Sequence, residues 1–130
     1  MKKEFSTEWK ASGQTRKQRK YLANAPLHIR QKLVSANLSK ELRKKVGKRN
    51  IEIRKGDSVK VMRGKFRGKT GKVGKVDLKK SRITIEGIQR QKKDGTKVNV
   101  YFRPSKVQIT EMVERKRKIK KTQENKEEKK

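Results

Sequence analysis

Residues 55–73 read KGDSVKVMRGKFRGKTGKV, and the fold that the sequence predicts follows from this stretch. Val59 and Val61 alternate with polar residues, which is the pattern of a half-buried strand. A basic loop follows this strand, and a second strand is expected from about Lys72. Because glycine tolerates positive φ and allows another backbone to come close, the glycines are expected to shape the loop. These glycines are Gly64, Gly68 and Gly71.

The loop carries a dense set of positive side chains. Lys and Arg neutralise phosphates, so a loop of this kind is suited to binding nucleic acid. Phe66, at the expected tip of the loop, can stack on an unpaired base, and it can equally cover the end of the core. The basic residues between and beside the glycines are Arg63, Lys65, Arg67, Lys69 and Lys72.

Residues 64–70, GKFRGKT, resemble a nucleotide-binding P-loop at first sight. A P-loop has four residues between its glycines and a helix after its Thr, so that backbone amides converge on the phosphates. Here only Lys65, Phe66 and Arg67 separate the two glycines, and a strand is expected after the loop. The sequence therefore does not predict an NTPase.

The same alternation recurs toward the C-terminus. Together with the two strands beside the glycine loop, it makes five short strands in about 60 residues. This predicts a mainly β fold, with a small, strongly bent, five-stranded barrel over residues 51–110. Between Val73 and Val76 the alternation slips by one residue beside Gly74, which predicts a β-bulge. The alternating apolar residues of the later strands are Ile83, Ile85, Val98, Val100, Phe102, Val107 and Ile109.

Residues 1–50 are predicted to form a basic, partly helical extension without strands. Asn24 is a candidate cap for a helix that carries Pro26 in its first turn, where a missing N–H does no harm. Ser39 is a second candidate N-cap, with Gly47 as the stop of its helix. The apolar stripes of these helices are narrow, so we expect the helices to pack on the barrel or on a partner.

The composition points to a polyanion as the partner. The 130 residues include 42 Lys or Arg and only 13 Asp or Glu, which gives a formal net charge of +29. A charge of this size opposes compaction, so much of it is expected to meet a partner of opposite sign. Residues 111–130 form a charged tail that is expected to be helical at its start and disordered toward its end.

Several functional classes are excluded by what the sequence lacks. It has no Cys and a single His, His28, so it offers neither a disulfide framework nor a zinc site. No apolar run approaches the ~20 residues of a membrane-spanning helix, and residues 1–5 do not begin a signal peptide. No pair of acidic residues lies in an apolar setting, so we expect no enzyme. We expect an intracellular protein without a cofactor, metal, small-molecule substrate, membrane contact or homo-oligomer.

The glycine loop and its strands resemble the KOW motif of ribosomal and transcription-elongation proteins. The matching residues are Gly56, Asp57, Val59, Val61, Gly64, Gly68, Gly71, Val73 and Val76. Segments outside the motif are more specific: they are similar to the archaeal and eukaryotic branch of the large-subunit ribosomal protein family numbered twenty-four in the universal scheme. These segments are RKQRKY (16–21), NAPLHIR (24–30), LSKELR (38–43) and VDLKK (76–80). The similarity covers about residues 12–110 and leans toward the archaeal members.

The resemblance implies an SH3-like barrel in a cytoplasmic protein of the large ribosomal subunit. Members of the family bind large-subunit rRNA directly near its five-prime end, nucleate subunit assembly and lie on the outside near the polypeptide exit. The resemblance also implies neighbouring large-subunit proteins as partners. Residues 103–106, RPSK, depart from the family pattern and receive no assigned contact. The residues expected to contact rRNA are Arg16, Lys17, Arg19, Lys20, Arg30, Lys55, Arg63, Lys65, Phe66, Arg67, Lys69 and Lys72.

Two other functions remain compatible with the residues. A transcription-elongation KOW module would bind polymerase, and it normally comes with an additional α/β domain, for which residues 1–50 offer helices only. A basic DNA-compacting protein is permitted by charge alone, and it would bind duplex DNA as well as it binds RNA.

Overall fold

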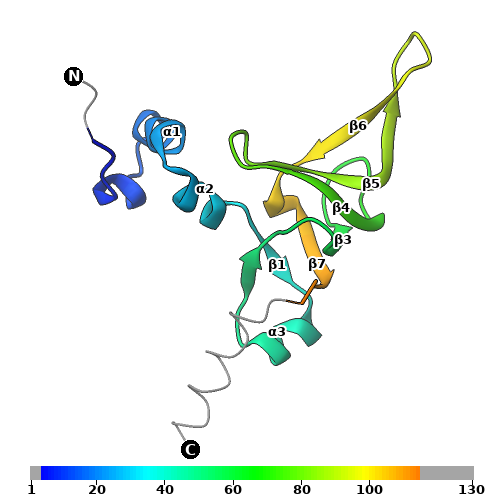
Figure 1. The fold of residues 1–130 in the computed structure, drawn as a ribbon, viewed down its shortest axis with the longest axis horizontal. Coiled ribbons are helices and arrows are strands. Elements are labelled where there is room, and N and C mark those ends of the chain that lie inside the picture. Colours follow the sequence, from blue (N-terminus) through cyan, green and yellow to red (C-terminus); the bar gives the residue numbers. More distant parts are fainter. Residues whose placement is uncertain (1–3, 115–130) are drawn as a thin grey trace, which may run out of the picture.

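The structure is a computed structural model, and it describes residues 4–114. A short 3-10 helix and two helices come first, a third helix follows the first strand, and all remaining elements except a second short 3-10 turn are strands (Figure 1). The expected C-terminal tail lies outside the described residues from residue 115 onward. The helical elements are η1 (Glu8–Ala11), α1 (Thr15–Asn24), α2 (Leu27–Leu33), α3 (Lys40–Val46) and η2 (Pro104–Lys106).

The strands form one sheet in the order β2-β1-β7-β3-β4-β5-β6. The five strands that alternation predicts are found as β3 to β7, and the mainly β fold is confirmed. Figure 1 shows β5 and β6 as a long hairpin that projects from the rest of the sheet. The strands are β1 (Ser35–Leu38), β2 (Asn50–Glu52), β3 (Ser58–Val61), β4 (Thr70–Asp77), β5 (Arg82–Gln91), β6 (Lys97–Phe102) and β7 (Val107–Glu111).

The predicted closure into a five-stranded barrel is not found. β1 pairs in parallel with β7, with Asn37 opposite Gln108 and Leu38 opposite Ile109, and β2 then pairs antiparallel with β1. The edge of β7 that barrel closure would need is therefore occupied by β1. Among the described residues the sheet ends at β2 on one side and at β6 on the other.

The expectation that residues 1–50 contain no strand is wrong. β1 has four residues, of which Ala36 and Leu38 are buried, and β2 has three. Runs this short give almost no periodic signal. They become strands by pairing with each other, and β1 also pairs with β7 from the other end of the chain.

Helix boundaries follow capping chemistry in one case and differ from the prediction in another. The Oγ of Ser39 accepts a hydrogen bond from the Leu42 amide at 3.3 Å, and Gly47 ends α3 with φ of 69°, as predicted. Asn24, by contrast, is the last residue of α1, and Pro26 is the N-cap of α2. The residue before a proline is driven into an extended conformation, so α1 stops before Ala25.

The hydrophobic core is a cluster of buried apolar side chains, most of which come from β3, β4, β5 and β7. The register of β4 against β5 shifts between Val73 and Lys75, which confirms the predicted bulge. The Oγ1 of Thr84 accepts a hydrogen bond from the Lys75 amide at 3.0 Å, so a side chain satisfies a backbone donor at the bulge. The fully buried side chains include Leu38, Val59, Val61, Val73, Ile83, Val107 and Ile109.

A buried acidic side chain joins the start of β3 to the end of β7. The two oxygens of Asp57 accept hydrogen bonds from the amides of Arg54 at 2.9 Å and Val113 at 3.1 Å. The Asp57 carbonyl also accepts from the Val73 amide at 2.9 Å. Asp57 is completely shielded from solvent, and it connects the turn before β3, strand β4 and the segment after β7.

Replacing Gly71 with Ala is expected to destabilise the protein by about 1–3 kcal/mol, because the β4–β5 contact leaves no room for a methyl group. A Cβ at position 71 would lie 2.7 Å from both the Glu86 carbonyl oxygen and the Ile85 Cγ2. Urea unfolding followed by circular dichroism measures the change. Gly13→Ala is the matched control, because no atom lies within 4 Å of its added Cβ. Equal stability of the two variants would contradict the close approach.

Replacing Asp57 with Asn is expected to lower the free energy of unfolding by about 1–3 kcal/mol, because the amide NH₂ must face one of the two buried N–H donors. The same urea experiment gives the value. Asp94→Asn is the control, since Asp94 lies in the exposed β5–β6 turn and accepts its hydrogen bonds from Thr96. If Asp57→Asn costs no more than Asp94→Asn, Asp57 does not hold the sheet together.

Candidate nucleic-acid interface

The loop between β3 and β4 is held in one shape by its own backbone. The Gly68 amide donates to the Val61 carbonyl at 2.8 Å, and the Arg67 amide donates to the Gly64 carbonyl at 3.0 Å. Gly64 and Gly68 have φ of 91° and 88°, a conformation that other residues adopt only with strain. These torsion angles are the ones that the predicted loop-shaping role of the two glycines requires. The exposed cations that the loop presents are Arg63, Lys65, Arg67 and Lys69.

Gly71 acts differently from the two loop glycines. It lies within β4, opposite Val59 of β3, and its missing side chain lets β4 pass close to the Glu86 carbonyl of β5. Its contribution is to strand packing, and it places the base of the loop against β5.

The ring of Phe66 faces the core. It meets Phe102 of β6 edge-on, with ring centroids 6.0 Å apart and an angle of 80° between the planes. The ammonium of Lys69 lies 5.4 Å from the centre of the Phe66 ring. Of the two roles considered for Phe66, these contacts support the one that covers the end of the core.

Two predicted contact residues lie away from the loop. Lys72 is on β4 opposite Ser58, at the start of β3, and Lys55 lies in the turn just before that strand. The loop begins after the other end of β3, about 10 Å further along at the usual rise per strand residue. The structure therefore groups the four loop cations and separates Lys55 and Lys72 from them.

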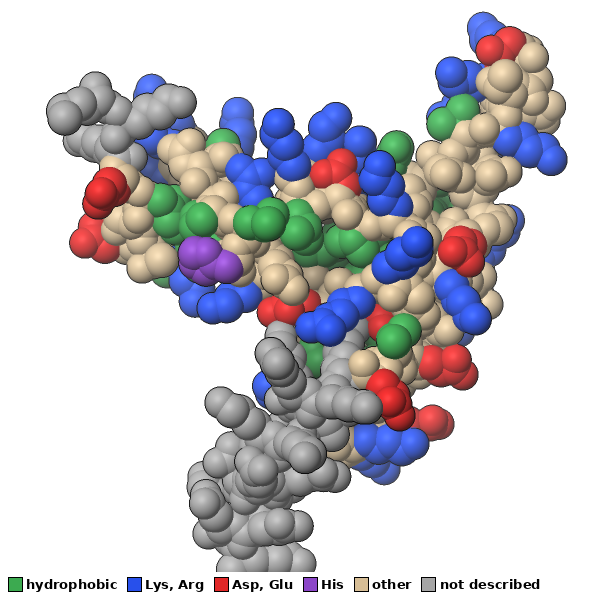
Figure 2. Space-filling view, viewed as in Figure 1, with side chains coloured by type: hydrophobic (Ala, Val, Ile, Leu, Met, Phe, Trp, Pro, Cys, Tyr) green, Lys and Arg blue, Asp and Glu red, His purple; other side chains and the backbone are tan. Residues whose placement is uncertain are grey.

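The first helix presents a second group of cations. Arg16, Lys17, Arg19 and Lys20 follow closely on one another along α1, and three of them are exposed, whereas Lys17 is partly buried. The Lys17 ammonium lies 4.2 Å from the centre of the Trp9 ring. Figure 2 shows Lys and Arg side chains on both sides of a hydrophobic stripe that runs from the N-terminal helices toward the sheet.

Arg30 has a structural role that the sequence did not reveal. Its Nε donates to the Ala25 carbonyl at 2.8 Å, and its Nη1 donates to the Lys79 carbonyl at 3.2 Å. Its Nη2 donates to the carbonyl of Ala23. A cation at the carbonyl end of a helix is favoured, so Arg30 stabilises the end of α1 while tying it to the β4–β5 turn.

The β4–β5 turn that receives Arg30 is itself ordered by charge. Asp77 accepts hydrogen bonds from the Lys80 amide at 3.0 Å and from the Arg82 Nε at 3.2 Å. The hydrogen bond from the Lys80 amide is the main reason why the pKa of Asp77 lies below its ordinary value, and the Arg82 side chain lowers this pKa further. The Arg82 guanidinium also lies over Tyr101, 3.8 Å from the ring centre. Arg82 is therefore engaged within the protein.

Other kinds of site find little support in the described part of the chain. Residues 4–114 contain no group of three or more His, Cys, Asp or Glu side chains placed to hold a metal ion. His28 is exposed on α2. The helices between residues 4 and 114 are all too short and too polar to cross a membrane.

Comparison with known proteins identifies the family to which the chain belongs. The curated protein "Large ribosomal subunit protein uL24" of Korarchaeum cryptofilum (strain OPF8) is 58% identical over 96 residues, which cover 74% of this chain and 73% of that protein. The family of ribosomal proteins described as L26 in eukaryotes and L24 in archaea matches residues 12–126. The resemblance to the archaeal and eukaryotic branch is thereby confirmed, and the chain belongs to this family of ribosomal proteins.

Proposed function

We propose that this protein is a structural constituent of the large ribosomal subunit in the cytoplasm and that it binds large-subunit rRNA directly. The observation that carries the proposal is the basic glycine loop of fixed shape in a chain of this ribosomal family. The loop supplies four exposed cations, and α1 supplies a second group. The formal net charge of +29 is then balanced by phosphates when the protein is in its complex.

The proposed mechanism is electrostatic cross-linking of folded RNA. The loop needs little ordering on contact, because its backbone hydrogen bonds already hold it. Arg30 ties the N-terminal helices to the β4–β5 turn, so the cations of α1 are carried by the same sheet. The two groups of cations can therefore bind two RNA segments and keep them at a fixed distance from each other. Specificity would come from the shape of the RNA and from unpaired bases.

Three finer features follow from the family resemblance. Strands β3 to β7 would be the SH3-like unit, although their sheet is extended by β1 and β2. The binding place would be near the five-prime end of the large rRNA, where early binding nucleates subunit assembly. The finished position would be on the outside of the subunit near the polypeptide exit, in contact with neighbouring large-subunit proteins.

The competing functions fit the structure less well. A transcription-elongation module would need a further α/β domain, but β1 and β2 join the same sheet as β7. Asp57, Asp77 and Asp94 each accept a backbone hydrogen bond within the protein, which favours a structural role for these three residues over a catalytic one. DNA compaction would have no need of a loop held in one shape, since charge alone drives it.

Replacing Lys65 and Arg67 with Ala is expected to weaken binding to large-subunit rRNA fragments. Log affinity falls as log salt rises, and each lost phosphate contact makes the steepness of this fall smaller by about 0.7 to 0.9. Two lost contacts therefore reduce the steepness by about 1.4 to 1.8. At 0.1 M salt this corresponds to an affinity loss of roughly 30-fold. Filter binding over a range of salt concentrations measures both quantities.

Lys92→Ala with Lys93→Ala is the matched control for this experiment. It removes the same charge from the exposed turn of the β5–β6 hairpin, which lies outside the proposed interface. An unchanged salt slope for the loop variant, or an equal loss in the control, would show that the loop is not the binding site. Equal competition by duplex DNA would favour the DNA-compacting function instead.

The protein is expected to co-sediment with the large ribosomal subunit in a sucrose gradient of cell lysate at low salt. Raising the salt should release it, because the attachment is mainly ionic. Immunodetection across the gradient fractions gives the distribution. Migration at the top of the low-salt gradient, apart from any ribosomal particle, would contradict the proposed function.

A further inference from the structure

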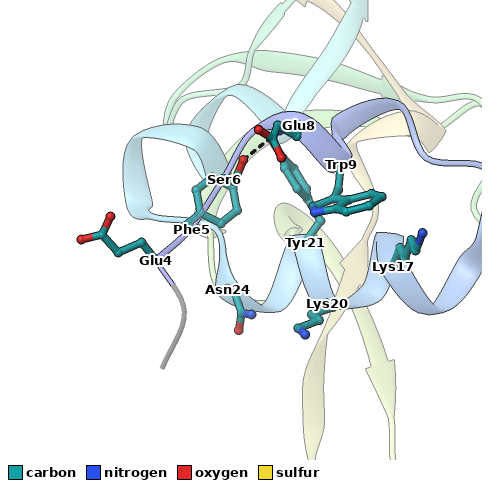
Figure 3. A pocket seen from close by; sticks show the side chains of 9 residues that line it. All are labelled: Glu4, Phe5, Ser6, Glu8, Trp9, Lys17, Lys20, Tyr21 and Asn24. Atoms are coloured by element: carbon teal, nitrogen blue, oxygen red, sulfur yellow. Dashed lines mark hydrogen bonds between the residues drawn. The ribbon is translucent and has the colours of Figure 1, made fainter. Parts of the chain in front are cut away.

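The segment before α1 folds back on that helix, and a half-open pocket of about 450 Å³ lies between them (Figure 3). This volume lies within the range of roughly 300–1,000 Å³ that is usual for small-ligand sites. Three aromatic side chains line it, namely Phe5, Trp9 and Tyr21. The centroids of Phe5 and Tyr21 are 5.0 Å apart, and Tyr21 is buried, whereas Trp9 is 50% exposed. The pocket thus offers one large accessible ring beside a packed pair.

Hydrogen bonds attach the segment that carries Trp9 to α1. The side-chain amide of Gln18 donates to the Ser12 carbonyl at 2.7 Å and to the Lys10 carbonyl at 3.1 Å. These bonds hold the end of η1, which carries Trp9, against the helix. The backbone that carries Trp9 is therefore held in place without a ligand, which reduces the ordering needed on contact.

The charged side chains around the rings form two sets, and each set suits a different part of a ligand. Lys17 and Lys20 stand on the α1 side of the pocket, where they can neutralise a phosphate. Glu4 and Glu8 also line the pocket, and their carboxylates repel a phosphate but accept hydrogen bonds from N–H groups. A ligand that suits both sets has a flat ring with N–H donors inside the pocket and a phosphate at the lysines.

We propose that this pocket takes one unpaired nucleobase of RNA, stacked on Trp9. The Lys17 ammonium lies over one face of the indole, 4.2 Å from its centre, so the base stacks on the other face. Arg16 and Arg19 on the same helix hold the adjoining backbone. The inference rests on the proposed function and adds to it. The N-terminal segment binds an unpaired base, whereas the loop between β3 and β4 binds phosphates.

Trp9 is the only tryptophan of the chain, so its fluorescence reports on this pocket alone. The full-length protein is titrated with a short single-stranded oligoribonucleotide, with an abasic strand of the same length, and with an RNA duplex. Because a stacked base quenches indole emission, the base-bearing strand is expected to quench Trp9 strongly. The abasic strand and the duplex are expected to bind through charge with little quenching.

Affinity measurements with Trp9→Ala give an independent readout. This variant is expected to bind the base-bearing strand about 5- to 150-fold more weakly, the usual loss for one stacked base, and to bind the abasic strand unchanged. Trp9→Phe keeps a ring and should retain most of the affinity. Tyr101→Ala is the control, because Tyr101 is also 50% exposed but lies on β6. Far-UV circular dichroism checks that the helices of the variants remain folded.

The possible outcomes distinguish this inference from the function on which it rests. If abasic and duplex RNA bind but the base-bearing strand causes no extra quenching, the pocket does not take a base, and the ribosomal function stands. Equal quenching by a polyglutamate peptide would likewise overturn the inference, because the pocket would then take an acidic protein segment. If none of the RNAs binds at low salt, the proposed rRNA binding itself fails.

Discussion

The shielded side chain of Asp57 is the contact on which the arrangement of the sheet depends. It lies just before β3, and through its carboxyl oxygens and its carbonyl it connects the preceding turn, β4 and the segment after β7. A buried acidic group is costly unless its oxygens accept hydrogen bonds, so the surrounding N–H groups can adopt few other positions. The loop between β3 and β4 takes its place from these strands. The position of the basic surface therefore depends on a polar contact inside the protein.

Local patterns were sufficient to predict β3 to β7, the bulge near Gly74, and the caps of α3 at Ser39 and Gly47, because each depends on neighbouring residues. β1 could not be predicted, since it is short and becomes a strand by pairing with β2 and with β7 from the other end of the chain. The same limit applies to Arg30, whose partner at Lys79 is distant in sequence. The cations of the glycine loop were predictable because glycine spacing marks a loop. The pocket at Trp9 was missed because it depends on a chain reversal, and the spacing of Trp9 and Tyr21 gives no periodic signal.

Positive side chains perform two different tasks in this protein. Two arginines donate to carbonyl groups inside the fold: Arg30 at the end of α1, and Arg43 to the Leu38 carbonyl at 2.9 Å. The planar guanidinium, with several donors in fixed directions, suits this task better than the ammonium of lysine. The loop between β3 and β4, in contrast, presents both residue types to solvent. Part of the net charge is therefore structural, and counting cations alone overstates the number that can meet phosphate.

The parallel pairing of β1 with β7 has a consequence for the order in which the chain can fold. Closing a long loop costs entropy that local contacts do not incur, so structures rich in distant contacts fold slowly. During synthesis β1 leaves the ribosome well before β7, and it can pair with β7 only after almost the whole described chain has emerged. The hairpins of the sheet are able to form first. Docking of β1 onto β7 is therefore a late step, which waits until β7 itself has been synthesised.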